Sequence, residues 1–162
     1  TPDLRLAKLA LPDVTGSLTA LQQEDAYFLS AATARLIGYG IGGTPSGDDL
    51  LVGLLAALTR SNTAQAGRMR HLLTTCLEGR LHTDATSLLS LTVLRHAMAG
   101  EFSEKIHHVT RQLMHPDDLE SLEVSLQRLL LHGATSGSEM FLGVCLGYLL
   151  TLNRITNTGK HQ

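Results

Sequence analysis

The segment Gly-Tyr-Gly-Ile-Gly-Gly-Thr-Pro-Ser-Gly-Asp-Asp, residues 38–49, combines the residue types that bind small anions. It leads into an almost entirely apolar stretch, and the first turn of an α-helix exposes unpaired N–H groups and a partial positive charge. Glycines let the backbone approach a ligand closely, and hydroxyl groups add hydrogen-bond donors. We therefore predict that this segment binds phosphate or a carboxylate, through Gly42, Gly43, Thr44, Ser46 and Gly47.

Other interpretations of the segment differ in what they explain. It is neither a Walker A loop nor a dinucleotide fingerprint, because no Lys follows the last glycine and no strand precedes the first. Ser46 and Asp49 have nearly the spacing and chemistry of a capping box, which would give them a structural role. Asp48 and Asp49 are also candidate catalytic acids, and one of them could hold Mg²⁺ while the other caps the helix.

A second loop, residues 133–139, repeats this pattern before another apolar stretch. We predict that Thr135, Ser136 and Gly137 contribute to the same anion site, and that the two helix N-termini converge. Glu139 either caps its helix or points into a polar site shared by both helices. His132 either suits the negative end of the preceding helix or acts as a general acid or base. Glu139 and His132 are therefore catalytic candidates.

Several other polar residues have more ordinary interpretations. Thr83, Thr86, Ser87 and Ser90 form a hydroxyl stripe that either packs against a helix or lines the same site. The remaining histidines lack metal-ligand spacing and are interpreted as surface or hydrogen-bonded residues: His71, His82, His96, His107, His108 and His115. Cys76 and Cys145 are expected to be reduced, buried thiols, with a disulfide between them left open.

Hydrophobic periodicity predicts an all-α fold, a compact bundle of about seven helices. Aromatic residues make up only 4% of the chain, and a Leu-rich core suits packed helices better than a sheet. The two stretches that are apolar on all sides should be central. Residues 4–10 have a weak strand pattern. The expected helices span about 17–37, 47–59, 64–77, 83–98, 103–114, 116–131 and 136–150.

The organisation along the chain is expected to be a helical domain at residues 16–152. Residues 1–15 are interpreted as the remnant of a linker or of a preceding N-terminal part, and 153–162 as a frayed tail.

A net charge of −2 and a pI near 6.4 argue against a nucleic-acid partner. The longest apolar run, 140–150, is about half of what a bilayer needs, so we expect no membrane partner. The composition, with two cysteines interpreted as reduced thiols, fits a cytoplasmic location.

A family resemblance is carried by residues 40–53. Their sequence is Gly-Ile-Gly-Gly-Thr-Pro-Ser-Gly-Asp-Asp-Leu-Leu-Val-Gly. This segment resembles the signature of a bacterial family formerly of unknown function, which includes the small subunit of oxamate carbamoyltransferase from allantoin breakdown. Residues 94–102 and 131–143 are similar to the same family. The family usually has Gly-Leu at the place of Gly42-Gly43. The chain resembles the C-terminal helical half of longer members whose N-terminal part is rich in strands.

The resemblance implies a subunit of a carbamoyltransferase, in which oxalurate and phosphate give oxamate and carbamoyl phosphate. Its implied partners are other subunits and a small anionic substrate such as phosphate, carbamoyl phosphate or an oxamate-like molecule. One alternative is a non-catalytic assembly module of a multi-subunit enzyme. Another is a Mg²⁺-dependent hydrolase similar to ADP-ribosylglycohydrolases, although the paired Asp-Thr-Asp pattern of that family is missing here.

Overall fold

The computed structural model describes residues 3–158, and this part of the chain is entirely helical, as predicted. It contains eight helices rather than seven. The predicted strand at residues 4–10 is wrong, because these residues lie in the first helix. The helices are α1 (Asp3–Gln23), α2 (Ala26–Leu36), α3 (Ser46–Arg60), α4 (Ala64–Glu78), α5 (Leu88–Met98), α6 (Glu104–Met114), α7 (Leu119–Leu130) and α8 (Ser136–Thr158).

Helices α3 and α8 form the centre of the molecule, as their apolar sequences predicted. Their contacts advance in the same direction along both helices, and glycines bring the backbones close together where the helices cross. A Cβ atom on Gly53 would lie 1.9 Å from the carbonyl oxygen of Met140, and one on Gly143 would lie 2.1 Å from that of Leu50. No side chain fits at either position, so the two glycines determine how closely the helices approach.

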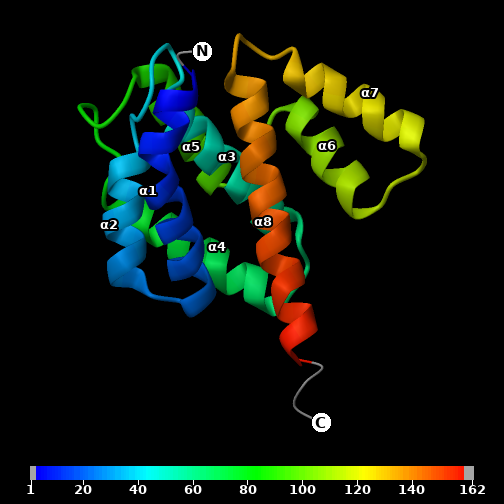
Figure 1. Ribbon diagram of the computed structural model, residues 1–162, viewed down its shortest axis with the longest axis horizontal. Coiled ribbons are helices and arrows are strands. Elements are labelled where there is room, and N and C mark those ends of the chain that lie inside the picture. The colour runs from blue at the N-terminus through cyan, green and yellow to red at the C-terminus, as the bar shows by residue number, and fades with distance from the viewer. Residues whose placement is uncertain (1–2, 159–162) are drawn as a thin grey trace.

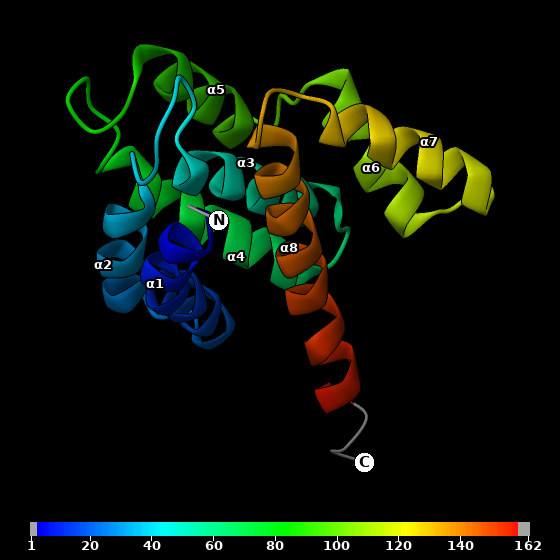
Figure 2. The same ribbon diagram turned by 45° about the horizontal axis from the view of Figure 1, so that its top comes forward.

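The other helices surround this pair. Figures 1 and 2 show α8 crossing α3, with α1 and α2 on one side and the α6–α7 hairpin on the other. Helices α4, α5 and α6 all contact α3. The core is rich in leucine and includes Leu21, Leu29, Leu36, Leu51, Leu54, Leu55, Leu58, Met69, Leu73, Leu77 and Leu94.

The helix predicted at residues 17–37 is instead divided between α1 and α2. The chain turns at Glu24, whose φ of 55° lies in the left-handed region, and Asp25 then caps α2 by accepting the N–H of Phe28. Left-handed backbone is most often marked by glycine, and none is present here. The helical spacing of apolar residues continues across the turn, so the sequence pattern does not reveal the break between α1 and α2.

Two predicted helix starts are also wrong. Helix α5 begins at Leu88 after its N-cap Ser87, not after Thr83, and α7 begins at Leu119 after its N-cap Asp118, not at Pro116. In both cases, the side chain of a residue nearer the helix accepts a hydrogen bond from a backbone N–H group of the first turn. The starts of α3, α4, α6 and α8 agree with prediction within a residue or so. Helix α8 continues through Thr158, and residues 159–162 of the predicted tail lie outside the described residues.

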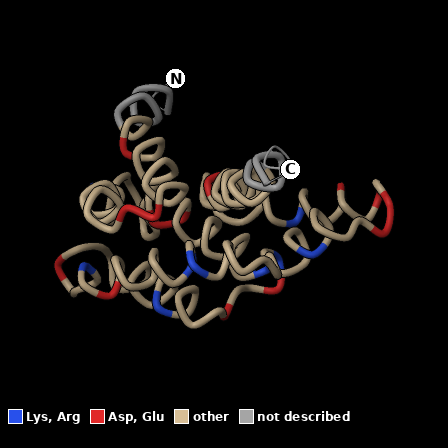
Figure 3. The backbone as a smooth tube through the Cα atoms, turned by 90° about the horizontal axis from the view of Figure 1, so that it is seen from below, with Lys and Arg blue, Asp and Glu red and all other residues tan. Residues whose placement is uncertain are grey.

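Charged residues are spread over the surface rather than gathered. Along the coloured part of the backbone, Lys and Arg are interspersed with Asp and Glu (Figure 3). None of the described helices combines the length and hydrophobicity that crossing a bilayer would require. Cys76 and Cys145 are both free thiols, as expected, although they are half-buried rather than buried.

Candidate functional site

The N-termini of α3 and α8 meet at one end of the central pair, which confirms the predicted convergence of the two loops. The hydroxyl oxygens of Thr44 and Ser136 lie 2.8 Å apart. The Ser46 hydroxyl donates a hydrogen bond of 2.5 Å to Oε1 of Glu139. Because the helices are parallel, the positive ends of both helix dipoles lie together here. We call this group the helix-end site, consisting of Thr44, Ser46, Asp49, Ser136 and Glu139.

The contacts within this site are nearly two-fold symmetric. Ser46 and Ser136 are each the first residue of a helix, and Asp49 and Glu139 each stand three residues further on. Ser46 donates to Glu139, while the Ser136 hydroxyl lies close enough to Asp49 to lower its pKa. Each helix therefore directs its first hydroxyl toward the acid of the other. Glu139 thus points into a shared polar site, one of its two predicted roles.

Asp48 fixes the first loop to α5. Its Oδ1 accepts the backbone N–H of Gly38 at 2.9 Å. Its Oδ2 accepts the Ser90 hydroxyl at 2.6 Å and also the Thr86 hydroxyl. Ser87 donates to the carbonyl oxygen of Gly43 from the same segment. Three of the four hydroxyls in the predicted stripe therefore hold the loop that carries the site.

Asp49 differs from Asp48 because its carboxylate is buried without a hydrogen-bond donor for each of its two oxygens. Its side chain is buried, with 1% of the residue exposed, and its Oδ2 has no hydrogen-bond partner. Burial raises the pKa of Asp49 to about 6, and the negative charges of Glu139 and Asp48 add to the rise. The hydroxyls of Ser136 and Thr44 oppose it. A buried acceptor without a donor is costly and points to an absent partner.

The capping-box interpretation of the first loop is wrong. The N-cap of α3 is Pro45, and no side chain caps the helix, because the Ser46 hydroxyl reaches across to α8 instead. The N–H groups of Gly47 and Gly137 already donate to carbonyl oxygens of their own loops, at 2.9 Å each. Among the groups that were predicted to bind an anion, those still available to a ligand are therefore mainly hydroxyls.

Two of the predicted anion-binding glycines are needed for packing. A Cβ atom on Gly47 would lie 2.0 Å from the carbonyl oxygen of Leu36, and one on Gly137 would lie 1.9 Å from that of Leu129. Each glycine lets its helix start against the last turn of the preceding helix. Gly42 and Gly43 are exposed on the outer part of the loop, where a ligand could reach their backbone.

A cavity of about 460 Å³ adjoins the helix-end site and is bounded by α3, α5, α6 and α8. Thr44 belongs to both. All three sequence segments that carry the family resemblance contribute to its lining. The apolar lining residues are Val52, Leu89, Val93, Phe102, Ile106 and Met140, and the polar ones are Thr44, His96, Glu101, Ser103 and His132.

His132 lies at this cavity, as a catalytic role would require, whereas Thr135 is exposed and donates weakly to Glu139 at 3.4 Å. His96 and Glu101 were missed by the sequence analysis. They are joined by a contact of 2.5 Å between Nδ1 and Oε2. Only Gly100, which ends α5 just before Glu101, signals the turn that brings them together.

The predicted magnesium site at Asp48 and Asp49 gains no further ligand. The two carboxylates point to different neighbours, Asp48 toward α5 and Asp49 toward α8. Among the described residues, no group of three or more His, Cys, Asp or Glu side chains is placed to hold a metal ion. A cation at Asp48 would have to replace the hydrogen bonds from Gly38, Thr86 and Ser90. The site therefore stays a prediction.

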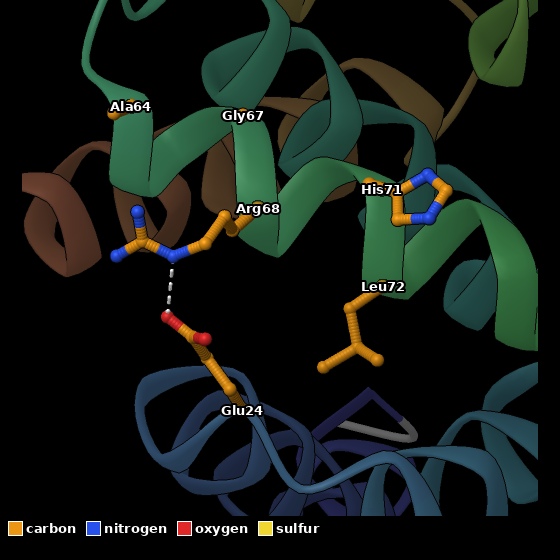
Figure 4. A pocket seen from close by; sticks show the side chains of 6 residues that line it. All are labelled: Glu24, Ala64, Gly67, Arg68, His71 and Leu72. Atoms are coloured by element: carbon orange, nitrogen blue, oxygen red, sulfur yellow. Dashed lines mark hydrogen bonds and ion pairs between the residues drawn. The ribbon is translucent and has the colours of Figure 1, made fainter.

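Another cavity, of about 490 Å³, lies between α4 and the turn that joins α1 to α2. Figure 4 shows Glu24 and Arg68 facing one another across it, with 3.0 Å between Oε1 and Nε. His71 and Leu72 also line it. None of the predicted anion-binding or catalytic residues lies here, so the helix-end site and its cavity are the better candidate.

Comparison with known proteins agrees with this choice of region. Residues 36–148 match the sequence model of a protein family described as oxamate carbamoyltransferase subunit AllH. This range contains both glycine-containing loops, all of the helix-end site and every residue that lines the adjoining cavity. No solved structure matches the chain.

Proposed function

The chain belongs to the family of oxamate carbamoyltransferase subunits AllH, and on that premise we propose that it forms part of the substrate site of such an enzyme. The ligand would be a small anion carrying a carbamoyl or amide group, such as oxamate, or the phosphate that accepts or supplies the carbamoyl group. The implied reaction of allantoin breakdown, between oxalurate and phosphate, is part of this proposal.

The observation that carries the proposal is the pairing of two helix N-termini beside a cavity of small-molecule size. The positive ends of α3 and α8 favour negative charge, and the hydroxyls of Thr44 and Ser136 are available to exchange their mutual bond for bonds to an anion. The exposed backbone of Gly42 and Gly43 adds further donors at the outer edge. The cavity has room for a ligand of several heavy atoms.

Asp49 supports an amide-bearing ligand rather than a simple anion. Its buried Oδ2 has no donor, although the hydroxyls of Thr44 and Ser136 lie close enough to the carboxylate to lower its pKa. An N–H group of a carbamoyl or amide ligand would satisfy this oxygen, which a carboxylate such as acetate cannot do because it has no donor. We therefore assign Asp49 the role of orienting substrate nitrogen, with Glu139 at the equivalent place on α8.

Calorimetric titration with oxamate, carbamoyl phosphate and inorganic phosphate tests the proposal. We expect Thr44→Val to weaken binding about 10-fold, because it removes a hydroxyl donor with little change in volume. Thr75→Val is the matched control, since the Thr75 hydroxyl bonds only to its own helix α4. Failure of all three ligands to bind, both to the chain alone and to the assembled enzyme, would contradict the proposal.

A second role, assembly with partner subunits, is favoured by exposed apolar side chains. Leu119 and Leu131 at the two ends of α7 are 83% and 82% exposed. On α8, Leu142 and Leu149 are each about half exposed. Contact with another protein chain would remove these exposed leucine side chains from water.

The two roles are separable by experiment. If the helix-end site is sufficient, the isolated chain binds the small anions and Asp49→Asn changes that binding. If the chain mainly supports assembly, ligands bind only when partner subunits are present. Substitution of Leu119 and Leu131 by Ser would then prevent co-purification with those subunits, while Thr75→Val would not.

A further inference from the structure

We propose that His96, held by Glu101, is the proton-transferring residue of the cavity beside the helix-end site. This inference rests on the proposed function, because it assigns a step in carbamoyl transfer to a residue of that same region. Neither residue was a catalytic candidate from the sequence. The pair lies on the wall formed by the end of α5, whereas the helix-end site belongs to α3 and α8.

The end of α5 explains why these two side chains meet. The N–H of Gly100 donates to the carbonyl oxygen of Ala97 at 3.0 Å, and the N–H of Glu101 donates to that of His96 at 2.9 Å. These two bonds define a Schellman motif, with Gly100 at the left-handed position with a φ of 85°. The motif reverses the chain, so that Glu101 lies beside the last turn of α5, which carries His96. Oε2 of Glu101 then lies 2.5 Å from Nδ1 of His96.

This geometry leaves the other ring nitrogen of His96 available. Within the described residues, the Glu101 contact is the one hydrogen bond of the imidazole, and it is made by Nδ1. A carboxylate on one nitrogen orients the ring and fixes its tautomer, so that Nε2 can exchange a proton with a ligand. The side chains of His96 and Glu101 are 60% and 66% exposed, so the pair contributes little to stability.

Carbamoyl transfer from the amide nitrogen of oxalurate to phosphate, with oxamate as the leaving group, needs such a group. A phosphate oxygen forms a bond to the carbamoyl carbon, the bond from that carbon to nitrogen breaks, and the electron pair remains on nitrogen. The leaving amide nitrogen must then gain a proton, which His96 would donate from Nε2 as imidazolium. The phosphate hydroxyl loses its proton to the imidazole and so regenerates the imidazolium. Protons therefore balance over one turnover. The reverse transfer runs through the same steps.

The other groups around the cavity are less suited to this role. Besides His96 and Glu101, its titratable lining residue is His132, whose ring has no hydrogen bond or ion pair with a carboxylate among the described residues. Asp49 belongs to the helix-end site rather than to the lining of the cavity, and its proposed role is to orient the substrate nitrogen. His96 therefore combines access to the cavity with a partner that orients its ring.

The test uses the enzyme assembled from this chain and its partner subunits, with carbamoyl transfer from carbamoyl phosphate to oxamate as the readout. We expect His96→Ala to lower kcat by about 10²- to 10⁴-fold with KM little changed, because a proton-transferring group acts mainly in the transition state. Added imidazole should restore part of this rate. Glu101→Gln should lower kcat by about 10-fold, and Glu101→Asp should recover most of it.

Controls separate this inference from the proposed function. His71→Ala, at the other cavity on α4, should leave kcat unchanged. Circular dichroism and calorimetric binding of oxamate and inorganic phosphate are measured for every variant. Wild-type enzyme that neither binds nor transfers would overturn the proposed function and this inference with it. Normal binding and transfer by the wild type, with kcat of His96→Ala unchanged or unrecovered by imidazole, would overturn the role of His96 alone.

Discussion

At the scale of single residues, the adjacent acids Asp48 and Asp49 have opposite energetic roles. Asp48 is buried with both oxygens hydrogen-bonded, whereas Asp49 is buried with Oδ2 unpartnered. The first arrangement stabilises the loop. The second is retained at a cost in stability, which is typical of groups that serve a ligand.

The first prediction concerns the pH dependence of stability at Asp49. Its pKa is about 6 in the folded chain and near 3.8 when exposed, so the folded state binds the proton more tightly. The contribution of Asp49 to stability must therefore fall as pH rises from about 4 to about 6, and stay lower above that range. Asp49→Asn removes this effect and should raise the free energy of unfolding at pH 7.5 by about 1–3 kcal/mol. Urea denaturation at several pH values measures the difference, which should vanish near pH 4.

The neighbouring substitution predicts the opposite sign. Asp48→Asn weakens charge-assisted hydrogen bonds from Gly38, Thr86 and Ser90 and should lower the free energy of unfolding at pH 7.5 by about 1–3 kcal/mol. The same urea titrations provide the measurement. Equal effects of the two substitutions would contradict the distinction drawn between the two acids.

The sequence was informative at this scale only where residue type and helix position sufficed. It identified both acids, both loops and the hydroxyl stripe, because polar residues at the start of an apolar helix are conspicuous. It did not distinguish Asp48 from Asp49, since their roles depend on which neighbouring helix each one faces. His96 was missed for the same reason, because its partner reaches it through the turn at Gly100.

At the scale of elements, the contact between α3 and α8 depends on glycine. Gly53 of α3 faces the Met140 carbonyl, and Gly143 of α8 faces the Leu50 carbonyl. The two contacts have equivalent places in the two helices. This close approach brings the two N-terminal turns within hydrogen-bonding distance, so helix packing and site geometry are one feature.

Alanine at either glycine should therefore be destabilising despite its higher helix propensity. Gly53→Ala places Cβ 1.9 Å from a backbone oxygen that cannot easily move, and we expect a loss of about 2–4 kcal/mol in the free energy of unfolding. Gly67→Ala on α4 is the matched control, because nothing lies within 4 Å of its added Cβ. That variant should gain about 0.5–1 kcal/mol. A loss in both variants, measured by denaturation, would contradict the packing argument.

Element prediction succeeded where the apolar pattern was continuous and failed at turns. Helices α3, α4 and α6 were predicted within a residue of their bounds, since caps and hydrophobic period agreed. The turn at Glu24 was missed because no glycine or proline marks it. The starts of α5 and α7 were placed too early because several residues there are equally good caps in sequence terms, and tertiary contacts select among them.

At the scale of the whole molecule, α7 is the least anchored of the internal helices. Leu129 is its one buried side chain, whereas α3 is buried along most of its length. Figure 2 shows α7 with α6 as a hairpin at the edge of the molecule. The partner-subunit role proposed above would bury this hairpin further.

Hydrogen exchange should reveal the difference in anchoring. Amides of α7 should exchange by local opening, whereas those of α3 should exchange only at rates close to global unfolding. Mass spectrometry of peptides from the two helices measures both in one sample. Addition of a partner subunit should slow exchange in α7 if that helix forms the interface. Equal protection of α7 and α3 in the isolated chain would contradict this picture.

The parallel arrangement of α3 and α8 also has a consequence for how the chain folds. The residues that join their N-termini are 92 and 93 positions apart in the sequence. Helical proteins usually fold quickly because most of their contacts are local, and contacts across long chain separations slow folding. The central interface is therefore a long-range contact of the kind that slows folding. We expect folding to be slow for a helical domain of this size, as stopped-flow refolding would show, and the helix-end site to form together with this interface.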